Sequence, residues 1–163
     1  MFLDEIPAGT RVFVDSNIFI YHFLDISESC TSFLSRAESQ DIVAYTSTIV
    51  LAEILHRLMI AEVVERYNLK PKDALEFLKK AETIPSLEKA ENALKEIPRF
   101  NVKLLHLPEE AVFQSTELRR KYSLLTNDSL NLYSMLSNHL SDMATNDSDF
   151  ERVKDIKVWK PRW

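Results

Sequence analysis

Four acidic residues of this sequence have the side chains and the neighbours needed to hold a divalent cation. They are Asp15, Glu53, Asp128 and Asp147. Asp15 follows the apolar run 12–14, and Asp147 follows a short apolar segment that ends at residue 144, so each stands after an expected strand. The carboxyl ends of parallel strands meet at one edge of a sheet, which would bring such acids together. Carboxylate oxygens are hard ligands that suit Mg²⁺ or Mn²⁺ rather than metals that prefer Cys or His.

Each of these acids also has an ordinary structural explanation when it is considered alone. An aspartate after a strand often caps a turn or a helix, which is the alternative for Asp15. Glu53 precedes Arg57 by four residues, in the order that favours a surface ion pair on a helix. Stabilisation of a helix dipole is the alternative for the other acids, Asp128, Asp147 and the neighbouring Asp149. Against a purely structural role, Glu53 lies in the apolar stretch 49–55, where a buried acid needs a partner.

The pattern of apolar residues predicts an α/β domain. Strands are expected at 11–14, 42–45, 102–107, 142–144 and 157–159. Helical patterns fill the intervals at 16–24, 29–39, 48–67, 109–122 and 127–138, with further helices from residue 70 and between Pro85 and Pro98. This alternation implies a mainly parallel sheet flanked by helices. We expect the segment 68–98 to be a helical insertion within a single domain that spans residues 1–163.

The composition excludes several classes of protein. The single cysteine, Cys30, allows no internal disulfide and no cysteine-based zinc site, which fits a reducing compartment. The single glycine, Gly9, leaves no glycine-rich phosphate loop. The first residues lack the basic start and apolar run of a signal peptide, and no apolar stretch approaches the roughly 18 residues of a spanning helix. We therefore expect a cytoplasmic protein with no membrane partner.

The net charge of −5 at first argues against a nucleic-acid partner, because phosphate binding favours a basic surface. Two bound divalent cations, however, would bring the total from −5 to −1. Basic residues also gather at 151–163, with a net charge of +3, and at 119–121. For each basic cluster alone, ordinary solvated surface charge is an equally good explanation.

Taken in order, the segments around the four acids resemble the motifs of the PIN-domain ribonucleases, especially the VapC-type toxins of toxin–antitoxin pairs. The segments are Phe13–Ile20, Thr48–Ile54, Glu117–Tyr122 leading to Asn127–Leu130, and Ala144–Val153. The resemblance spans nearly the whole chain and implies a PIN-like three-layer α/β/α sandwich. Two departures stand out: Asn131, Tyr133 and Ser134 replace the usual small residues after the third acid, and the interval from Glu53 to Asp128 is longer than in most members.

The resemblance implies a divalent-metal-dependent ribonuclease that cleaves RNA endonucleolytically through the four carboxylates, with Mg²⁺ or Mn²⁺ as cofactor. Asp15, Glu53 and Asp128 are expected to hold one ion, while Asp147 helps to place a second ion or orients the attacking water. Asp149 competes with Asp147 for that role. Asn17 and Thr145 are expected to fix the rotamers of the carboxylates.

The expected partners are an RNA substrate, a small antitoxin protein and a second copy of the chain in a homodimer. Two alternatives stay open: a PIN-like module that binds RNA or protein without cutting, and an RNA-processing nuclease that is not a toxin. A phosphatase of the haloacid-dehalogenase type would need an acid two positions after its first aspartate, where this chain has Asn17.

Overall fold

A five-stranded sheet forms the centre of the computed structural model, which describes residues 1–163. Its strands are β1 (Arg11–Val14), β2 (Val43–Ser47), β3 (Lys103–Leu105), β4 (Asp142–Ala144) and β5 (Lys157–Trp159). They lie in the order β3-β2-β1-β4-β5, and every neighbouring pair is parallel. The expected mainly parallel sheet is therefore confirmed, and it is parallel throughout.

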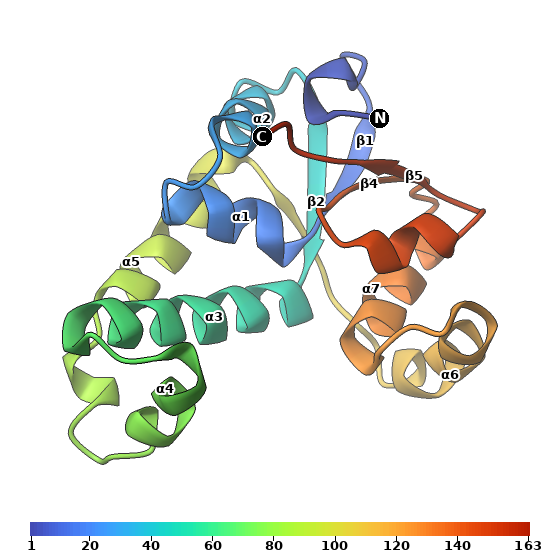
Figure 1. Cartoon of the computed structure of the whole chain (residues 1–163). Helices are drawn as coiled ribbons and strands as arrows, with labels where there is room; N and C mark the ends of the chain where they lie inside the picture. The colour runs from blue at the N-terminus through green and yellow to red at the C-terminus, as the bar shows by residue number, and fades with distance from the viewer.

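Seven α-helices connect and cover the strands: α1 (Ser16–Phe23), α2 (Glu28–Glu38), α3 (Thr48–Tyr67), α4 (Pro71–Leu78), α5 (Lys89–Glu96), α6 (Glu110–Tyr122) and α7 (Thr126–Ser137). Short 3-10 helices lie at η1 (Leu3–Glu5), η2 (Ile84–Ser86), η3 (Ile97–Phe100) and η4 (Ser148–Arg152). The helices that connect β1 to β2 and β2 to β3, which are α1 to α5, lie on one face of the sheet, as right-handed crossovers require. The connection from β3 to β4 runs in the opposite direction across the sheet, so α6 and α7 lie on the other face. Figure 1 shows the resulting α/β/α arrangement, which confirms the expected fold class. None of the helices combines the length and apolar character that a membrane span requires.

The central strands are apolar because helices cover both of their faces. Val12, Phe13 and Val14 of β1 are fully buried, as are Met143 and Ala144 of β4. Such continuous apolar runs are typical of parallel strands buried on both sides, where alternation with polar residues would leave polar groups without water. The apolar core therefore ends at the carboxyl ends of β1 and β4, where Asp15 and Thr145 follow.

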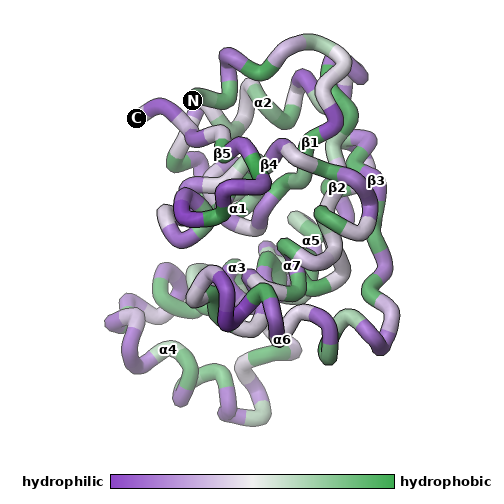
Figure 2. Tube along the Cα trace, turned by 90° about the vertical axis from the view of Figure 1, so that its right-hand side faces the viewer, coloured by the Kyte–Doolittle hydropathy of each residue, from purple (hydrophilic) through white to green (hydrophobic).

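The segment 68–98 is a helical insertion, as expected, and it packs against α3. A small separate apolar cluster, made of Val63, Ala74, Leu78 and Leu87, joins α3 to the inserted helices. Figures 1 and 2 both show α4 on the side of α3 that is turned away from the sheet. The insertion thus lengthens the layer around α3 without entering the sheet.

One buried carboxylate fixes the start of α5 on α3. Glu62 is 3% exposed and accepts hydrogen bonds from the backbone N–H groups of Glu88 at 3.1 Å and Lys89 at 3.0 Å. Arg66, one turn further along α3, donates to the same carboxylate at 3.0 Å. The first N–H groups of a helix have no partner within the helix, so Glu62 satisfies them from a neighbouring element.

Candidate active site

The candidate site lies where the direction of the strand order reverses. The chain passes from β1 to β2 in one direction across the sheet and returns to β4 on the other side of β1. In parallel α/β sheets, such a switch point opens a crevice at the carboxyl ends of the strands. The register pairs Val14 with Ala144, so Asp15 and Thr145 leave the sheet side by side. Strand-end geometry alone therefore brings the first and last motifs together.

Asp15 is 6% exposed, and three donors hold its carboxylate. Its Oδ1 accepts a hydrogen bond from the Ser16 backbone N–H at 2.7 Å, which caps α1. Its Oδ2 accepts from Asn17 Nδ2 at 2.6 Å and from Thr145 Oγ1 at 2.6 Å. Asp15 is thus a helix cap and a member of the site at once, and both residues expected to orient it, Asn17 and Thr145, contact it.

Glu53 reaches the site from the second turn of α3. The helix starts directly after β2, where Ser47 Oγ accepts from the Val50 N–H at 3.2 Å and donates to Asn131 Oδ1 of α7 at 2.7 Å. This anchor fixes the first turns of α3 against α7. The ion pair that was the alternative for Glu53 is not formed: both Glu53 and Arg57 line one pocket, and the i,i+4 pair of α3 is the one between Glu62 and Arg66.

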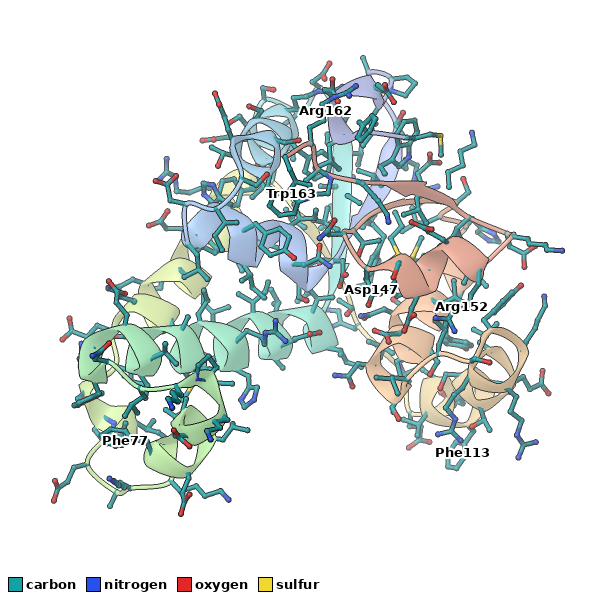
Figure 3. The ribbon with its side chains drawn as sticks, in the orientation of Figure 1. Phe77, Phe113, Asp147, Arg152, Arg162 and Trp163 are labelled. Carbon is teal, nitrogen blue, oxygen red and sulfur yellow. The ribbon has the colours of Figure 1, made fainter.

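Asp128, Asp147 and Asp149 form a cluster in which one carboxylate oxygen of each lies within 4.8 Å of the others. Asp128 is in the first turn of α7. Asp147 caps η4, because its Oδ1 accepts from the Asp149 N–H at 2.8 Å. Figure 3 labels Asp147 at the start of η4 and Arg152, which forms an ion pair with Asp149, at its end. Asp147 therefore caps a helix, as its structural alternative suggested, and still belongs to the acidic cluster.

A pocket of about 240 Å³ contains Asp15, Glu53, Asp128 and Asp147, and Asp149 does not line it. Four further polar residues line the pocket, and the sequence did not single them out as site residues: Ser16, Tyr21, Arg57 and Asn146. Asn146 Nδ2 donates to the Tyr21 hydroxyl at 3.3 Å, and the Asn146 N–H donates to Asn17 Oδ1 at 3.0 Å. Helical spacing could have suggested Tyr21 and Arg57, since each lies four residues after Asn17 and Glu53 respectively.

Burial and neighbouring acids destabilise the charged forms of two acids in this pocket, Asp15 and Asp128. Burial raises the pKa of Asp15 from 3.8 to about 6, the charges of Glu53 and Asp128 add to the increase, and hydrogen bonds from Thr145 and Ser16 oppose it. Burial likewise raises the pKa of Asp128 from 3.8 to about 6, reinforced by the charges of Asp147, Glu53 and Asp149. A bound cation would relieve this repulsion, because it favours the charged form of each carboxylate.

The donor set fits a hard divalent cation. Every charged ligand available in the pocket and its adjoining cluster is a carboxylate, and neither contains histidine or cysteine. Mg²⁺ and Mn²⁺ accept such oxygen ligands, whereas softer metals favour nitrogen or sulfur. The residues present therefore suit Mg²⁺ or Mn²⁺.

The basic C-terminal residues are mostly engaged in ion pairs. Arg162 donates to Asp4 at 3.0 Å and to Glu5 at 2.9 Å, and Lys160 pairs with Glu151. Figure 3 shows Arg162 far from Asp147. Of the two explanations for the basic cluster at 151–163, neutralised surface charge describes these residues better than an RNA-binding surface.

Comparisons with known proteins agree with this geometry. The sequence model of the PIN domain matches residues 12–156, so the chain belongs to the PIN domain family. Ribonuclease VapC2 of Methanocaldococcus jannaschii is 29% identical over 150 residues, which cover 91% of this chain and 92% of the relative. Ribonuclease VapC6 of the same organism is 24% identical over 154 residues, which cover 94% of this chain and 99% of the relative. The resemblance to VapC-type PIN-domain ribonucleases is confirmed.

Solved structures share the fold. VapBC2 from Rickettsia felis, bound to a DNA fragment from its promoter, has a TM-score of 0.57 at 16% identity and covers 94% of this chain and 100% of its own. VapC20 of Mycobacterium tuberculosis, a toxin that cleaves the sarcin–ricin loop, has a TM-score of 0.57 at 14% identity and covers 88% and 95%. At these identities the likeness establishes the fold alone.

Proposed function

We propose that this protein is a divalent-metal-dependent endoribonuclease. The observation that supports the proposal is that Asp15, Glu53, Asp128 and Asp147, which are far apart in the sequence, line one pocket at the switch point of the sheet. The names of its relatives, Ribonuclease VapC2 and Ribonuclease VapC6, point to RNA as the substrate. The whole span 1–163 would act as one nuclease domain.

In this proposal Asp15, Glu53 and Asp128 hold one Mg²⁺ or Mn²⁺, and Asp147 helps to hold a second ion or orients the attacking water. The bound metal would lower the pKa of a water molecule and shield the negative charge that develops on the scissile phosphate. Asn17 and Thr145 hold the Asp15 carboxylate in one rotamer through their hydrogen bonds. Asp149, whose charge is already paired with Arg152, plays the smaller part among the two acids of this loop.

The direct test is cleavage of RNA by the purified protein with Mg²⁺ or Mn²⁺ and with EDTA. We expect metal-dependent cleavage that Asp15→Asn reduces about 100-fold or more, because a carboxylate that holds the ion is lost. Asp25→Asn is the matched control: Asp25 is exposed, its φ of 54° suits asparagine, and it does not line the acid pocket. A folded Asp15→Asn variant that cuts as fast as the wild type would refute the mechanism, and RNA binding without metal-dependent cleavage would favour the non-catalytic module.

We further propose that the protein is the toxin of a toxin–antitoxin pair, that it forms a homodimer and that it acts in the cytoplasm. Structures with the same fold include a toxin–antitoxin complex from Klebsiella pneumoniae and VapBC-1 from Haemophilus influenzae. A short adjacent reading frame should encode a small protein that co-purifies with this chain and suppresses its cleavage of RNA. Light scattering after gel filtration should give twice the mass of 18.9 kDa. Cleavage without growth arrest on induction, and without such a reading frame, would instead identify an RNA-processing nuclease.

A further inference from the structure

A second hollow adjoins the acid pocket and has no role in the function proposed above. It has a volume of about 540 Å³, and α3 contributes one stripe of residues to it, from Ile49 to Ile60, while Asn127 of α7 also lines it. The stripe residues recur three and four positions apart, as one face of a helix requires, over about 16 Å at 1.5 Å per residue. We call this hollow the α3 groove.

The α3 groove and the acid pocket are continuous. Glu53 and Arg57 line both of them. Figures 1 and 3 show the first turns of α3 beside α7 and close to the loop that carries Asp147. If one phosphodiester of a polymer lies in the acid pocket, the adjacent units of the polymer need a path out of it. The α3 groove offers such a path, because it adjoins the pocket at Glu53 and Arg57.

Arg57 is the basic side chain at the junction of the two hollows. Its side chain is exposed and forms neither an ion pair nor a hydrogen bond, although Glu53 lies one turn away. Most other arginines of the chain have carboxylate partners: Arg36, Arg66, Arg99, Arg152 and Arg162. A guanidinium that is free at the rim of an acidic pocket is available for an anion, and its planar set of donors matches a phosphate.

The rest of the groove suits a nucleoside. Ile49 and Ile60 are half-buried, and Ala52 between them is small and exposed. These three residues form the apolar part of the groove lining. His56 is exposed in the same stripe and offers a flat ring on which a base can stack. Asn127 adds an amide that can both donate and accept hydrogen bonds. Glu53, at the junction with the acid pocket, is the one acid that lines the groove.

We propose that the α3 groove binds the nucleotide next to the scissile phosphate of a single-stranded RNA, and that Arg57 binds the phosphate of that nucleotide. The inference rests on the proposed nuclease function and adds the path of the substrate. Arg57 is then a positioning residue: it neutralises a phosphate beside four acids that would otherwise repel the strand. The acids hold the reacting group, and Arg57 draws the strand towards them.

The test uses the full-length protein and a 5′-fluorescein single-stranded RNA of ten nucleotides. In cleavage assays with Mg²⁺, Arg57→Ala should raise KM about tenfold, the size expected when one charge-assisted phosphate contact is lost. The same variant should change kcat less than KM. The dependence of log KM on log salt concentration should weaken by about one unit, and Arg57→Lys should restore this salt dependence because it keeps the charge. Arg99→Ala is the matched control, since Arg99 is an exposed arginine of η3 outside both hollows.

Fluorescence anisotropy with Ca²⁺ in place of Mg²⁺ measures binding of the same RNA independently of cleavage. Arg57-dependent binding without any cleavage would uphold the groove and overturn the nuclease function. Cleavage with an unchanged KM and salt dependence in Arg57→Ala would overturn the groove alone, and a wild type that neither binds nor cuts would overturn both. An acidic peptide of ten residues that binds as tightly, with the same loss in Arg57→Ala, would overturn the assignment to RNA in favour of a protein partner. Arg57→Gln serves in place of Arg57→Ala if melting curves show that the alanine variant is unfolded.

Discussion

In the absence of divalent cations, the wild-type protein should lose stability relative to Asp15→Asn as the pH rises from about 4 to about 7. The pKa of Asp15 is about 6 in the folded protein, against 3.8 ordinarily. Between these values the folded protein holds a proton that the unfolded chain has released. The free energy of unfolding therefore falls as the pH increases through this range, and the contribution of the protonated Asp15 is complete only below about pH 4.

The size of this effect follows from the shift in the pKa of Asp15. A shift of about two pKa units lowers the free energy of unfolding by about 3 kcal/mol between pH 4 and pH 7. Solvent screens the charge of Asp15 weakly, because the residue is only 6% exposed. Asp15→Asn removes the titrating group, so the difference in unfolding free energy between the two proteins isolates its contribution. Hydrogen bonds lost in the variant add an offset that does not depend on pH.

Urea unfolding at several pH values, with EDTA present, measures the difference directly. A second series with Mn²⁺ should stabilise the wild type at neutral pH, by about 2.7 kcal/mol at a concentration one hundred times the Kd, and should stabilise the variant less. Asp25→Asn, at an exposed position outside the acid pocket, serves as the control. If the difference in unfolding free energy between wild type and Asp15→Asn stays constant from pH 4 to pH 7, the pKa of Asp15 is not raised in the folded protein.

Three further predictions concern single side chains. Asp147→Asn should reduce metal-dependent cleavage of RNA about 100-fold, whereas Asp149→Asn should reduce it less than tenfold, because of these two acids only Asp147 lines the acid pocket; equal losses in steady-state assays would refute this distinction. Thr145→Val should reduce the affinity for metal about 10- to 100-fold, and Thr145→Ser should retain it, as metal titration monitored by calorimetry can check; a valine variant with wild-type affinity would contradict this. Glu62→Ala should lower the unfolding free energy by about 3 kcal/mol in urea titrations and leave KM for RNA unchanged, since it removes a buried carboxylate that binds the N–H groups at the start of α5 and Arg66, and not a site residue. A loss below about 1 kcal/mol would refute the role of Glu62 in fixing α5 on α3.

The strands could be predicted closely from the sequence because their burial is a local property. The bounds of β1, β4 and β5 are those expected, since each is a short apolar or β-favouring run with polar residues on both sides. For β2 the expectation of 42–45 ended two residues early, because Thr46 and Ser47 resemble a capping cluster. Ser47 does cap α3, yet it is also the last residue of the strand and fully buried. One residue fulfils two roles there, and a local pattern assigns only one.

The candidate site was predictable in part. Asp15 and Asp147 follow from strand ends, whereas Glu53 and Asp128 depended on the family resemblance, because the rotation of α3 and α7 about their axes is set by tertiary packing. The choice between Asp147 and Asp149 could not be made from a spacing of two residues. It depends on where each side chain points, and Arg152 is the partner of Asp149 alone.

The hydroxyl of Thr145 connects the two halves of the site across the switch point. Its Oγ1 donates to Asp15 Oδ2 at 2.6 Å and accepts from Asn17 Nδ2 at 3.0 Å and from the Asp147 N–H at 3.0 Å. A hydroxyl has one hydrogen to donate and two lone pairs, so these contacts use its full capacity. Because Thr145 is fully buried, no water can replace a contact that is lost. The Asp15 carboxylate and the Asp147 backbone are therefore linked through one atom, and we expect a change at Thr145 to affect both acids.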